Sequence, residues 1–318
     1  MNRSATLRRI AFAGAGFATA AGLPLRTFAQ APLPTIRAGV AIADSYAQAF
    51  YGDDAGIFRQ NGIALDIRPL ANSGAIAAAI VGGSLDVGVG SPPQVAAAHE
   101  NGLPFVFFAP SAVFVPEAPT TLLMVAKNST IKTAADLNGK TVAADNLKSF
   151  PQLSVTAWMQ KNGGDPASVK FVEMPFFSMA GALETGRVDA AEIAEPALTA
   201  SRATCRQLAS PFEAIGRSWY LSAWFSTKDW LTTNAALAHR FTQALTQTAV
   251  WANGHQKETA VVLERVSKMS HDVVVSMTRS RFGERMDPAL MEPLFAVALK
   301  GGMLNAPITA KEMIAPGF

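Results

Sequence analysis

The sequence has few of the residues that hold metals or attack substrates. Cys205 is the only cysteine in 318 residues, so no intrachain disulfide can form and a structural zinc site is not expected. The four histidines, at 99, 239, 255 and 271, show no H-E-x-x-H or other metal-ligand spacing. Neither a G-x-S-x-G elbow nor a phosphate-binding G-x-x-x-x-G-K-[ST] loop is present. We therefore expect no catalytic residues, no bound metal and no cofactor.

Acidic residues are absent before Ala31, whereas four arginines (Arg3, Arg8, Arg9 and Arg26) lie there. The apolar stretch at about 10–22 is shorter than the roughly 20 residues that cross a bilayer. A basic start, a short apolar run and small residues after it are typical of a secretory signal peptide. We expect residues 1–31 to be this signal and the mature protein to be exported, soluble and periplasmic.

The point of cleavage and the export route stay open. Cleavage after Ala29 fits Thr27-Phe28-Ala29 and is favoured, because Pro32 would directly follow the alternative site after Ala31. The pair Arg8-Arg9 permits either the general or the twin-arginine route. No cysteine directly follows the apolar run, so a lipid anchor is not expected.

Charged residues are only 16% of the chain, and apolar residues are 49%, so a large core can be buried. The formal net charge of +3 comes from the leader, and removing its four arginines lowers it to about −1. Nothing in this balance indicates a nucleic-acid partner. No proline-rich linker divides the rest, which favours lobes built from interleaved segments over separate domains.

A weak internal repeat is present. Gly83 and Gly186 are 103 residues apart, as are Asp86 and Asp189, and each pair follows an alanine-rich helical stretch. Upstream, Gln60-Asn61-Gly62 and Lys161-Asn162-Gly163 look like matching helix ends, 101 residues apart. Each copy reads strand, helix, strand, helix, strand, which predicts an α/β fold with parallel sheets. Loops at the carboxyl ends of such strands meet at a crevice, so two lobes would enclose a site between them.

Several segments, in this order and spacing, resemble the nitrate/sulfonate/taurine-type family of ABC-transporter substrate-binding proteins. They are "DAGIFRQNGIALDI", "ANSGAIAAAIVGGSLDVGVGSPPQVAAAHENGLPFVFFA", "LLMVAKNSTIKTAADLNGKTVAAD", "ETGRVDAAEIAEPAL" and "YLSAWFSTKDWL". The resemblance covers nearly the whole mature chain. It implies the type II periplasmic-binding-protein fold, in which two Rossmann-like lobes are joined by two hinge crossings.

The resemblance also implies the organisation and the partners. Hinges near 125–128 and 220–226 would give one lobe from 32–125 plus 224–318 and a second from 126–223. Such a protein, expected to be a monomer, captures a small molecule and delivers it to an ABC permease and its ATPase subunit at the inner membrane.

Candidate ligand-binding residues lie where predicted strands lead into helices. Serine and glycine suit these positions because helix N-termini carry unpaired N–H groups and favour anions. For any one serine alone, plain N-capping is the favoured role, and the case for binding depends on several of these residues converging on one site. The candidates are Asp44, Ser45, Tyr46, Ser73, Gly90, Ser91 and Pro92 in the first lobe, and Lys148, Ser149, Phe150, Phe177, Ser178 and Glu195 in the second.

Lys148 is the most specific of these candidates, because it stands before a predicted helix N-terminus that disfavours a cation unless an anion is bound. The alternative, which stays open, is that Lys148 is a solvated charge in an exposed loop. The ligands of the resembling family imply a small organic anion, a sulfonate or carboxylate with or without an aromatic ring. Tyr46, Phe150, Phe176 and Phe177 are candidates to stack on such a ring or to belong to the core.

Two other functions are compatible with the same fold. One is an enzyme resembling the thiamine-pyrimidine synthases, which depend on clustered cysteine and histidine residues that this chain lacks. The other is the ligand-sensing domain of a transcription regulator, which would need a helix-turn-helix where the export signal stands.

Overall fold

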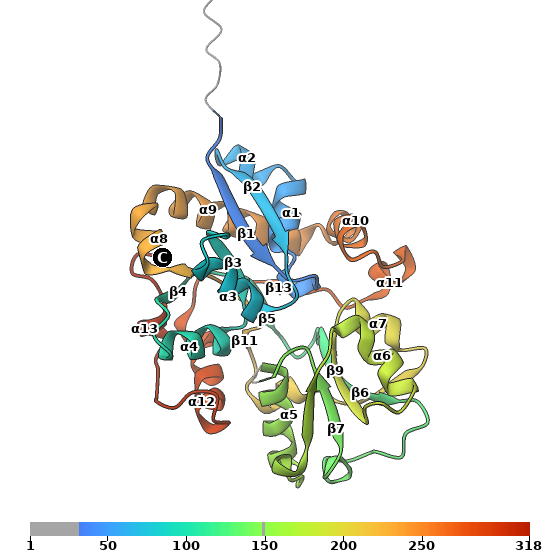
Figure 1. Ribbon diagram of the computed structural model, residues 1–318. Coiled ribbons are helices and arrows are strands. Elements are labelled where there is room, and N and C mark those ends of the chain that lie inside the picture. The colour runs from blue at the N-terminus through green and yellow to red at the C-terminus, as the bar shows by residue number, and fades with distance from the viewer. Residues whose placement is uncertain (1–31, 148–149) are drawn as a thin grey trace, which may run out of the picture. The chain divides into compact units, whose positions relative to one another are not determined.

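The computed structural model describes residues 32–147 and 150–318, and the part from Leu33 to Phe318 forms one compact unit. Strands and helices alternate along it, and most strands belong to two five-stranded sheets (Figure 1). Among the described residues, no helix combines the length and the apolar character needed to cross a membrane.

The first sheet has the strand order β2-β1-β3-β12-β4. Its strands β1 to β3 are parallel, and β12 runs antiparallel to both of its neighbours. The strands are β1 (Thr35–Val40), β2 (Ala64–Pro69), β3 (Val87–Gly90), β4 (Phe105–Pro110) and β12 (Ala223–Thr227). The helices of this part are α1 (Gln48–Asp54), α2 (Ile57–Gln60), α3 (Ser73–Val81), α4 (Pro92–Glu100), α8 (Lys228–Thr233) and α9 (Ala235–Gly254).

The second sheet repeats this arrangement with the order β8-β7-β9-β6-β10. Here β7 to β9 are parallel and β6 is antiparallel to β9 and β10, so the two sheets match strand for strand. The strands are β6 (Thr121–Ala126), β7 (Thr141–Ala144), β8 (Lys170–Glu173), β9 (Ala190–Ala194) and β10 (Cys205–Ala209). The helices are α5 (Phe150–Lys161), α6 (Phe176–Glu184) and α7 (Ala197–Ser201). The predicted repeat and fold class are confirmed.

The aspartates and glycines that mark the repeat make equivalent contacts and turns in both copies. The Asp86 carboxylate accepts from the Arg37 amide at 2.8 Å, and the Asp189 carboxylate accepts from the Thr141 amide at 2.9 Å. Each aspartate thus ties the start of the third strand of its copy to the first. The glycines before them, Gly83 and Gly186, have φ of 71° and 69°, a left-handed conformation that other residues adopt only with strain.

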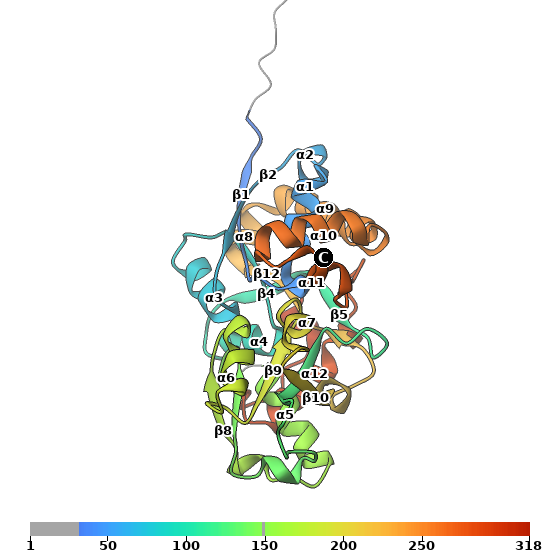
Figure 2. The same ribbon diagram turned by 90° about the vertical axis from the view of Figure 1, so that its right-hand side faces the viewer.

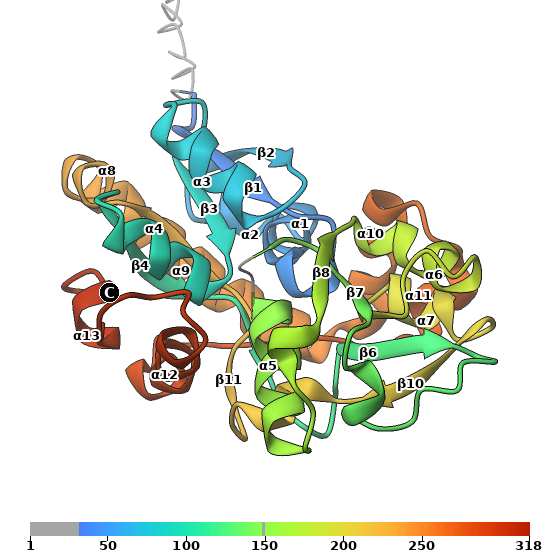
Figure 3. The same ribbon diagram turned by 60° about the horizontal axis from the view of Figure 1, so that its bottom comes forward.

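A small third sheet and the C-terminal segments complete the structure. The sheet has the order β11-β5-β13, with β5 (Ala112–Phe114), β11 (Trp219–Tyr220) and β13 (Arg281–Phe282). The last helices are α10 (Gln256–Ser267), α11 (His271–Ser276), α12 (Glu292–Lys300) and α13 (Ala310–Met313). Single 3₁₀ turns lie at Asp44–Tyr46, Ala135–Leu137, Pro166–Ser168, Pro211–Ala214 and Pro288–Leu290. Figure 2 shows α7 beside α11, which it contacts, and Figure 3 shows α12 beside α5.

Both large sheets are covered on two faces. In β4, Phe107 packs in the cluster of α3, α4 and α12, whereas its neighbour Phe108 packs with Trp224 and Phe241 of α9 on the opposite face. This follows from the two-residue period of a strand, in which successive side chains point to opposite faces. Burial on both faces explains why these strands are continuous apolar runs in the sequence and do not alternate between apolar and polar residues.

The chain passes from the first sheet to the second between β5 and β6, and returns between β10 and β11. The sequence placed the first hinge at 125–128, which would leave β6 in the first lobe. The pairing of β6 with β9 and β10 assigns 121–125 to the second sheet instead. The hinge predicted from the sequence lies after β6, whereas the crossing precedes it. The amino-acid composition does not change at the crossing, because β6 is as apolar as the strands before it, so the sequence does not mark this point.

Candidate functional site

A cavity of about 250 Å³ lies at the carboxyl ends of β1, β2, β7 and β8, so residues of both sheets line it. The loops after these strands supply its walls, as expected for parallel sheets. The lining residues are Ala41, Ile42, Tyr46, Leu70, Ala71, Asn72, Ser73, Asp145, Glu173, Pro175, Phe176 and Phe177.

Two neighbouring cavities share its walls. A small one of about 40 Å³ has Tyr46, Asp145 and Phe176 in common with the first. Its other lining residues are Ser45, Ser91, Gln94, Thr121, Phe150, Pro151, Ala194, Phe212 and Leu221. A groove of about 540 Å³ between α3, α4 and 302–305 includes Ser73 and Gln94. We call the cavities of about 250 Å³ and about 40 Å³ together the cleft.

Hydroxyl groups form a chain along the first-sheet wall of the cleft. The Tyr46 hydroxyl lies 3.3 Å from Ser73 Oγ, and Ser73 Oγ accepts from the Ser91 amide at 3.1 Å. Burial, together with the negative charge of Asp145, raises the pKa of Tyr46 above its ordinary value, so the phenol stays protonated. Ser91 is only 5% exposed, and its own Oγ has no hydrogen-bond partner among the described residues. A buried hydroxyl without a protein partner in a cavity wall leaves a hydrogen bond that water or a ligand can complete.

The charged groups that line the described cleft are both acidic. Asp145 follows the last residue of β7 and borders both cavities, and Glu173 ends β8. Among the lining residues that the structure describes there is no lysine, arginine, histidine or cysteine. The described chain also holds no group of three or more His, Cys, Asp or Glu able to bind a metal ion.

Aromatic rings make up the second-sheet wall. Phe176 and Phe177 are the first residues of α6, where the chain turns from β8 into the helix. Phe177 is 47% exposed and lines the larger cavity, so its ring is accessible to a ligand there. Phe150, at the start of α5, lines the small cavity but is 4% exposed and packs on Phe212 and Trp219.

Several candidates from the sequence thus lie together, and others do not. Ser45, Tyr46, Ser73, Ser91, Phe150 and Phe177 line the cleft. Gly90 and Pro92 flank Ser91 but are packed: a Cβ at Gly90 would lie 2.8 Å from the Phe225 ring, and Pro92 is the buried first residue of α4. Ser178 is exposed in the first turn of α6. Lys148 and Ser149 lie outside the described residues.

Asp44 and Glu195 do not border the cleft cavities, and their carboxylates are occupied within the protein. The Asp44 carboxylate is 1% exposed and pairs with Arg279 at 3.0 Å, besides accepting from the Ser280 amide. Glu195 is 2% exposed and accepts from the amide and hydroxyl of Thr199. Both residues follow strands, as predicted, but their side chains point into the protein interior, where Arg279 and Thr199 bind them.

Other cleft residues were not among the sequence candidates, notably Gln94, Thr121, Asp145 and Glu173. Asp145 was accessible to the same reasoning that selected Asp44, because each closely follows the first strand of a repeat copy. The Asn72 side chain caps α3 by accepting from the Ala75 amide at 3.0 Å, which leaves its amide hydrogens for the cleft. Gln94 lies inside α4, where no strand end points to it.

A buried acid stands behind the second-sheet wall. Glu192 of β9 is 0% exposed, and its Oε1 lies 2.8 Å from Ser154 Oγ in α5. Burial raises the pKa of Glu192 well above its ordinary range, and the charge of Asp145 acts in the same direction, against the weaker effect of the Ser154 contact. Ser154 Oγ also lies 2.8 Å from the carbonyl oxygen of Pro151. A hydroxyl has one proton, so a protonated Glu192 completes this chain, which fixes the first turn of α5 at the cleft.

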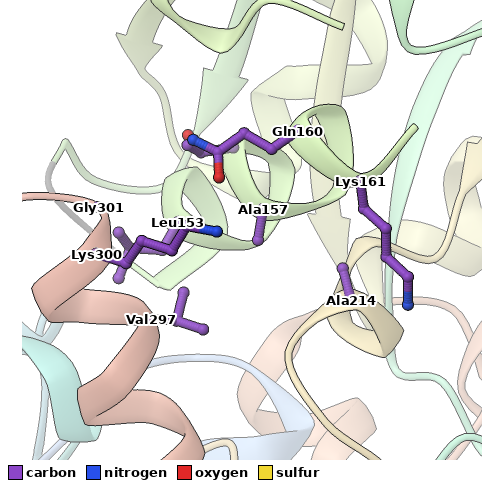
Figure 4. A pocket seen from close by; sticks show the side chains of 9 residues that line it. Leu153, Ala157, Gln160, Lys161, Ala214, Val297, Lys300 and Gly301 are labelled. Atoms are coloured by element: carbon purple, nitrogen blue, oxygen red, sulfur yellow. The ribbon is translucent and has the colours of Figure 1, made fainter. Parts of the chain in front are cut away.

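Another cavity, of about 350 Å³, lies between α5, α12 and the turn at 211–214 (Figure 4). It shares no lining residue with the cleft. Its two lysines, Lys161 and Lys300, come from different helices and do not point toward each other in Figure 4. No set of polar groups converges there, so we assign the site to the cleft.

The comparisons with known proteins agree with this fold. The family model described as NMT1/THI5 like matches residues 44–259. The chain belongs to this NMT1/THI5-like family. No curated protein matches the sequence.

Solved structures of similar fold include binding proteins and an enzyme. The alkanesulfonate-binding protein SsuA from Xanthomonas axonopodis pv. citri, bound to MOPS, is 16% identical with a TM-score of 0.74, covering 90% of this chain and 99% of that one. The periplasmic nitrate-binding protein NrtA from Synechocystis is 14% identical with a TM-score of 0.73, covering 88% and 84%. The desulfurization enzyme DSZB is 16% identical with a TM-score of 0.64, covering 89% and 97%. At these identities the likenesses show the shared fold.

Proposed function

We propose that this family member is the exported solute-binding component of an ABC importer. One lobe is built on each five-stranded sheet, and the cleft between them captures a small solute for delivery to a membrane permease with its ATPase. The observation that carries this is the cleft itself, formed by strand ends of both sheets and bordered by the Ser91 hydroxyl, which has no partner among the described residues. Its cavities are at or below the lower end of ordinary ligand pockets, which favours a small solute.

Capture requires the two lobes to move relative to each other. Few polar contacts join the sheets at the α7 end of the cleft: the Asp44 amide donates to the Glu195 carbonyl oxygen at 3.4 Å, and the Thr278 amide to Glu195 Oε1 at 3.3 Å. Both are long, and α7 contacts α11 beside them. Contacts this weak are compatible with opening and closing about the two crossings.

Ligand-driven closure is the first prediction. Small-angle scattering of the purified protein is expected to give a smaller radius of gyration with a saturating ligand than without it. A ligand that raises the melting temperature but leaves the radius of gyration unchanged would remove closure from the proposal and leave binding in place. The melting temperature detects binding independently, because a ligand of the folded state adds RT ln(1 + [L]/Kd) to stability.

Export is the second prediction. Mass spectrometry of the periplasmic fraction is expected to find a chain that begins near Gln30 or Pro32, as the leader composition indicates. The intact leader in an integral membrane fraction would contradict export as a soluble protein.

An enzyme of the same fold is the alternative, since DSZB shares it. Among the described residues, Cys205 lies in β10 and is 3% exposed, and burial raises the pKa of its thiol. None of the four histidines lines the cleft. Conversion of a bound solute by the purified protein would favour the enzyme.

A further inference from the structure

We propose that Phe150 is a positioning residue that sets the angle between the two lobes, because its ring joins the wall of the cleft to an aromatic cluster at the two crossings. The cluster consists of Phe114, Phe150, Phe212 and Trp219. This inference rests on the proposed binding function and concerns how a solute in the cleft controls closure. A solute that moves Phe150 changes the packing at the crossings, and the lobe angle changes with it.

Three of the four rings belong to the crossings themselves. Phe114 is the last residue of β5, where the chain leaves for the second sheet, and Trp219 is the first residue of β11, where it has returned. The two residues pair across β5 and β11, and their rings stack with centroids 4.9 Å apart. Phe212 lies in the second crossing, with its ring centroid 4.9 Å from that of Trp219 and 5.6 Å from that of Phe114. These rings therefore pack the two crossings against each other.

Phe150 comes from a different part of the fold. It begins α5, a helix of the second sheet that Figure 3 shows beside β11, and its ring centroid lies 4.3 Å from that of Trp219 and 5.1 Å from that of Phe212. One turn later, Leu153 packs in the same hydrophobic cluster, whereas Val155 on the opposite face of α5 packs in the core of the second sheet. Since α5 packs in both lobes, a rotation of one lobe against the other has to shift Phe150 on the rings at the crossings.

The same ring borders the cleft. Phe150 and Phe212 both line the small cavity of about 40 Å³, although neither is more than 4% exposed. Protein interiors are closely packed, so a solute that extends into this small cavity has to displace one of the two rings. Packed elements respond to such small displacements by exchanging one arrangement for another, and this links the occupied cleft to the crossings.

The ring cluster can rearrange without breaking a hydrogen bond at its centre. The Trp219 side chain is fully buried, and its indole N–H has no hydrogen-bond partner among the described residues. Aromatic pairs are favourable over many tilts and over centroid separations of about 4.5–7 Å. The rings can therefore slide from one packing to another, which a cluster fixed by hydrogen bonds could not do.

The test measures the distance between the lobes in the absence of any solute. Spin labels are attached at Lys132→Cys in the second lobe and at Lys257→Cys in α10, which packs on α1 and α9 of the first lobe. Both positions are exposed, whereas Cys205 is 3% exposed and is not expected to react. In Phe150→Ala, the distance distribution from pulsed electron paramagnetic resonance is expected to broaden. Its maximum is expected to shift by a few ångströms, the scale on which packed elements rearrange.

A conservative variant and a matched control separate this role from a purely structural one. Phe150→Leu keeps part of the bulk and is expected to give a smaller shift in the same direction, and it serves if Phe150→Ala folds poorly. Phe58 is also fully buried, and its ring stacks on Phe241 with centroids 5.4 Å apart, but within the core of the first sheet. Phe58→Ala is expected to lower the melting temperature, as Phe150→Ala does, and to leave the distance distribution unchanged.

Two results would overturn the proposal. One is a distance distribution in the Phe150 variants that matches the wild type, and the other is an equal change in Phe58→Ala. Because no solute enters the experiment, either result leaves the binding function standing. A failure of the binding function is detected separately, as the absence of thermal stabilisation by any solute.

Discussion

Arg279→Met is expected to lower the free energy of unfolding by about 3–5 kcal/mol, because it leaves a buried carboxylate without its counter-charge. The Arg279 and Asp44 side chains are 9% and 1% exposed, and Arg279 Nη2 lies 3.0 Å from Asp44 Oδ1. The guanidinium also donates to the Tyr51 hydroxyl at 2.9 Å and to Thr259 Oγ1 at 3.1 Å. Urea denaturation of the ligand-free protein measures the loss.

The matched control is Arg265→Met. Arg265 pairs with Asp54 at 2.7 Å, but the two side chains are 59% and 40% exposed, and exposed pairs contribute about 0–1 kcal/mol. Equal losses in the two variants would show that burial of the Asp44–Arg279 pair adds nothing. Asp44→Asn, which leaves Arg279 buried and unpaired instead, is expected to resemble Arg279→Met.

The same ion pair has a bearing on the cleft. Asp44 begins the 3₁₀ turn whose next two residues, Ser45 and Tyr46, line the cavities. Its carboxylate holds this turn to the segment at 279–280. Asp44 therefore positions Tyr46. The sequence predicted that the Asp44 carboxylate would contact the ligand, whereas in the structure it pairs with Arg279 behind the cleft.

The parts of the fold that the sequence predicted are those set by local rules. Hydrophobic strands, glycine at left-handed helix ends, and an aspartate before the third strand recur at a fixed offset, and the offset predicted two equivalent sheets. The T-x-x-E pattern at Thr309–Glu312 follows a local rule too, and both hydrogen bonds of a capping box are present there at the start of α13. The similar pattern at Thr133–Asp136 leads only into the 3₁₀ turn at Ala135–Leu137.

What the sequence left undetermined depends on long-range packing. The partner of β6 is chosen by sheet pairing, and no residue within the strand indicates it. Whether a polar residue after a strand faces the cleft or the interior depends on distant side chains, as Arg279 shows for Asp44, 235 residues away. Gln94 enters the cleft from inside a helix, where no rule about strand ends applies.

Glu192→Gln is expected to stabilise the protein increasingly as pH rises above about 4.5, the ordinary pKa of a glutamate. The pKa of Glu192 is raised in the folded state, so below 4.5 the carboxyl is protonated in both states and costs nothing. Above 4.5 the unfolded chain releases the proton and the folded chain retains it, which lowers wild-type stability by about 1.4 kcal/mol per pH unit until the folded pKa is passed. The glutamine stays neutral and keeps an N–H for Ser154 Oγ, so the Glu192→Gln protein does not lose this stability.

The urea midpoints of both proteins at pH 5, 6, 7 and 8 measure how their stabilities diverge. As a control, the stability of Glu117→Gln, which removes an exposed carboxylate, is expected to change with pH in parallel with that of the wild type. A Glu192→Gln difference that is constant across this range would mean that Glu192 is ionised in the folded protein, and that the Ser154 hydroxyl donates to the carboxylate instead of to Pro151.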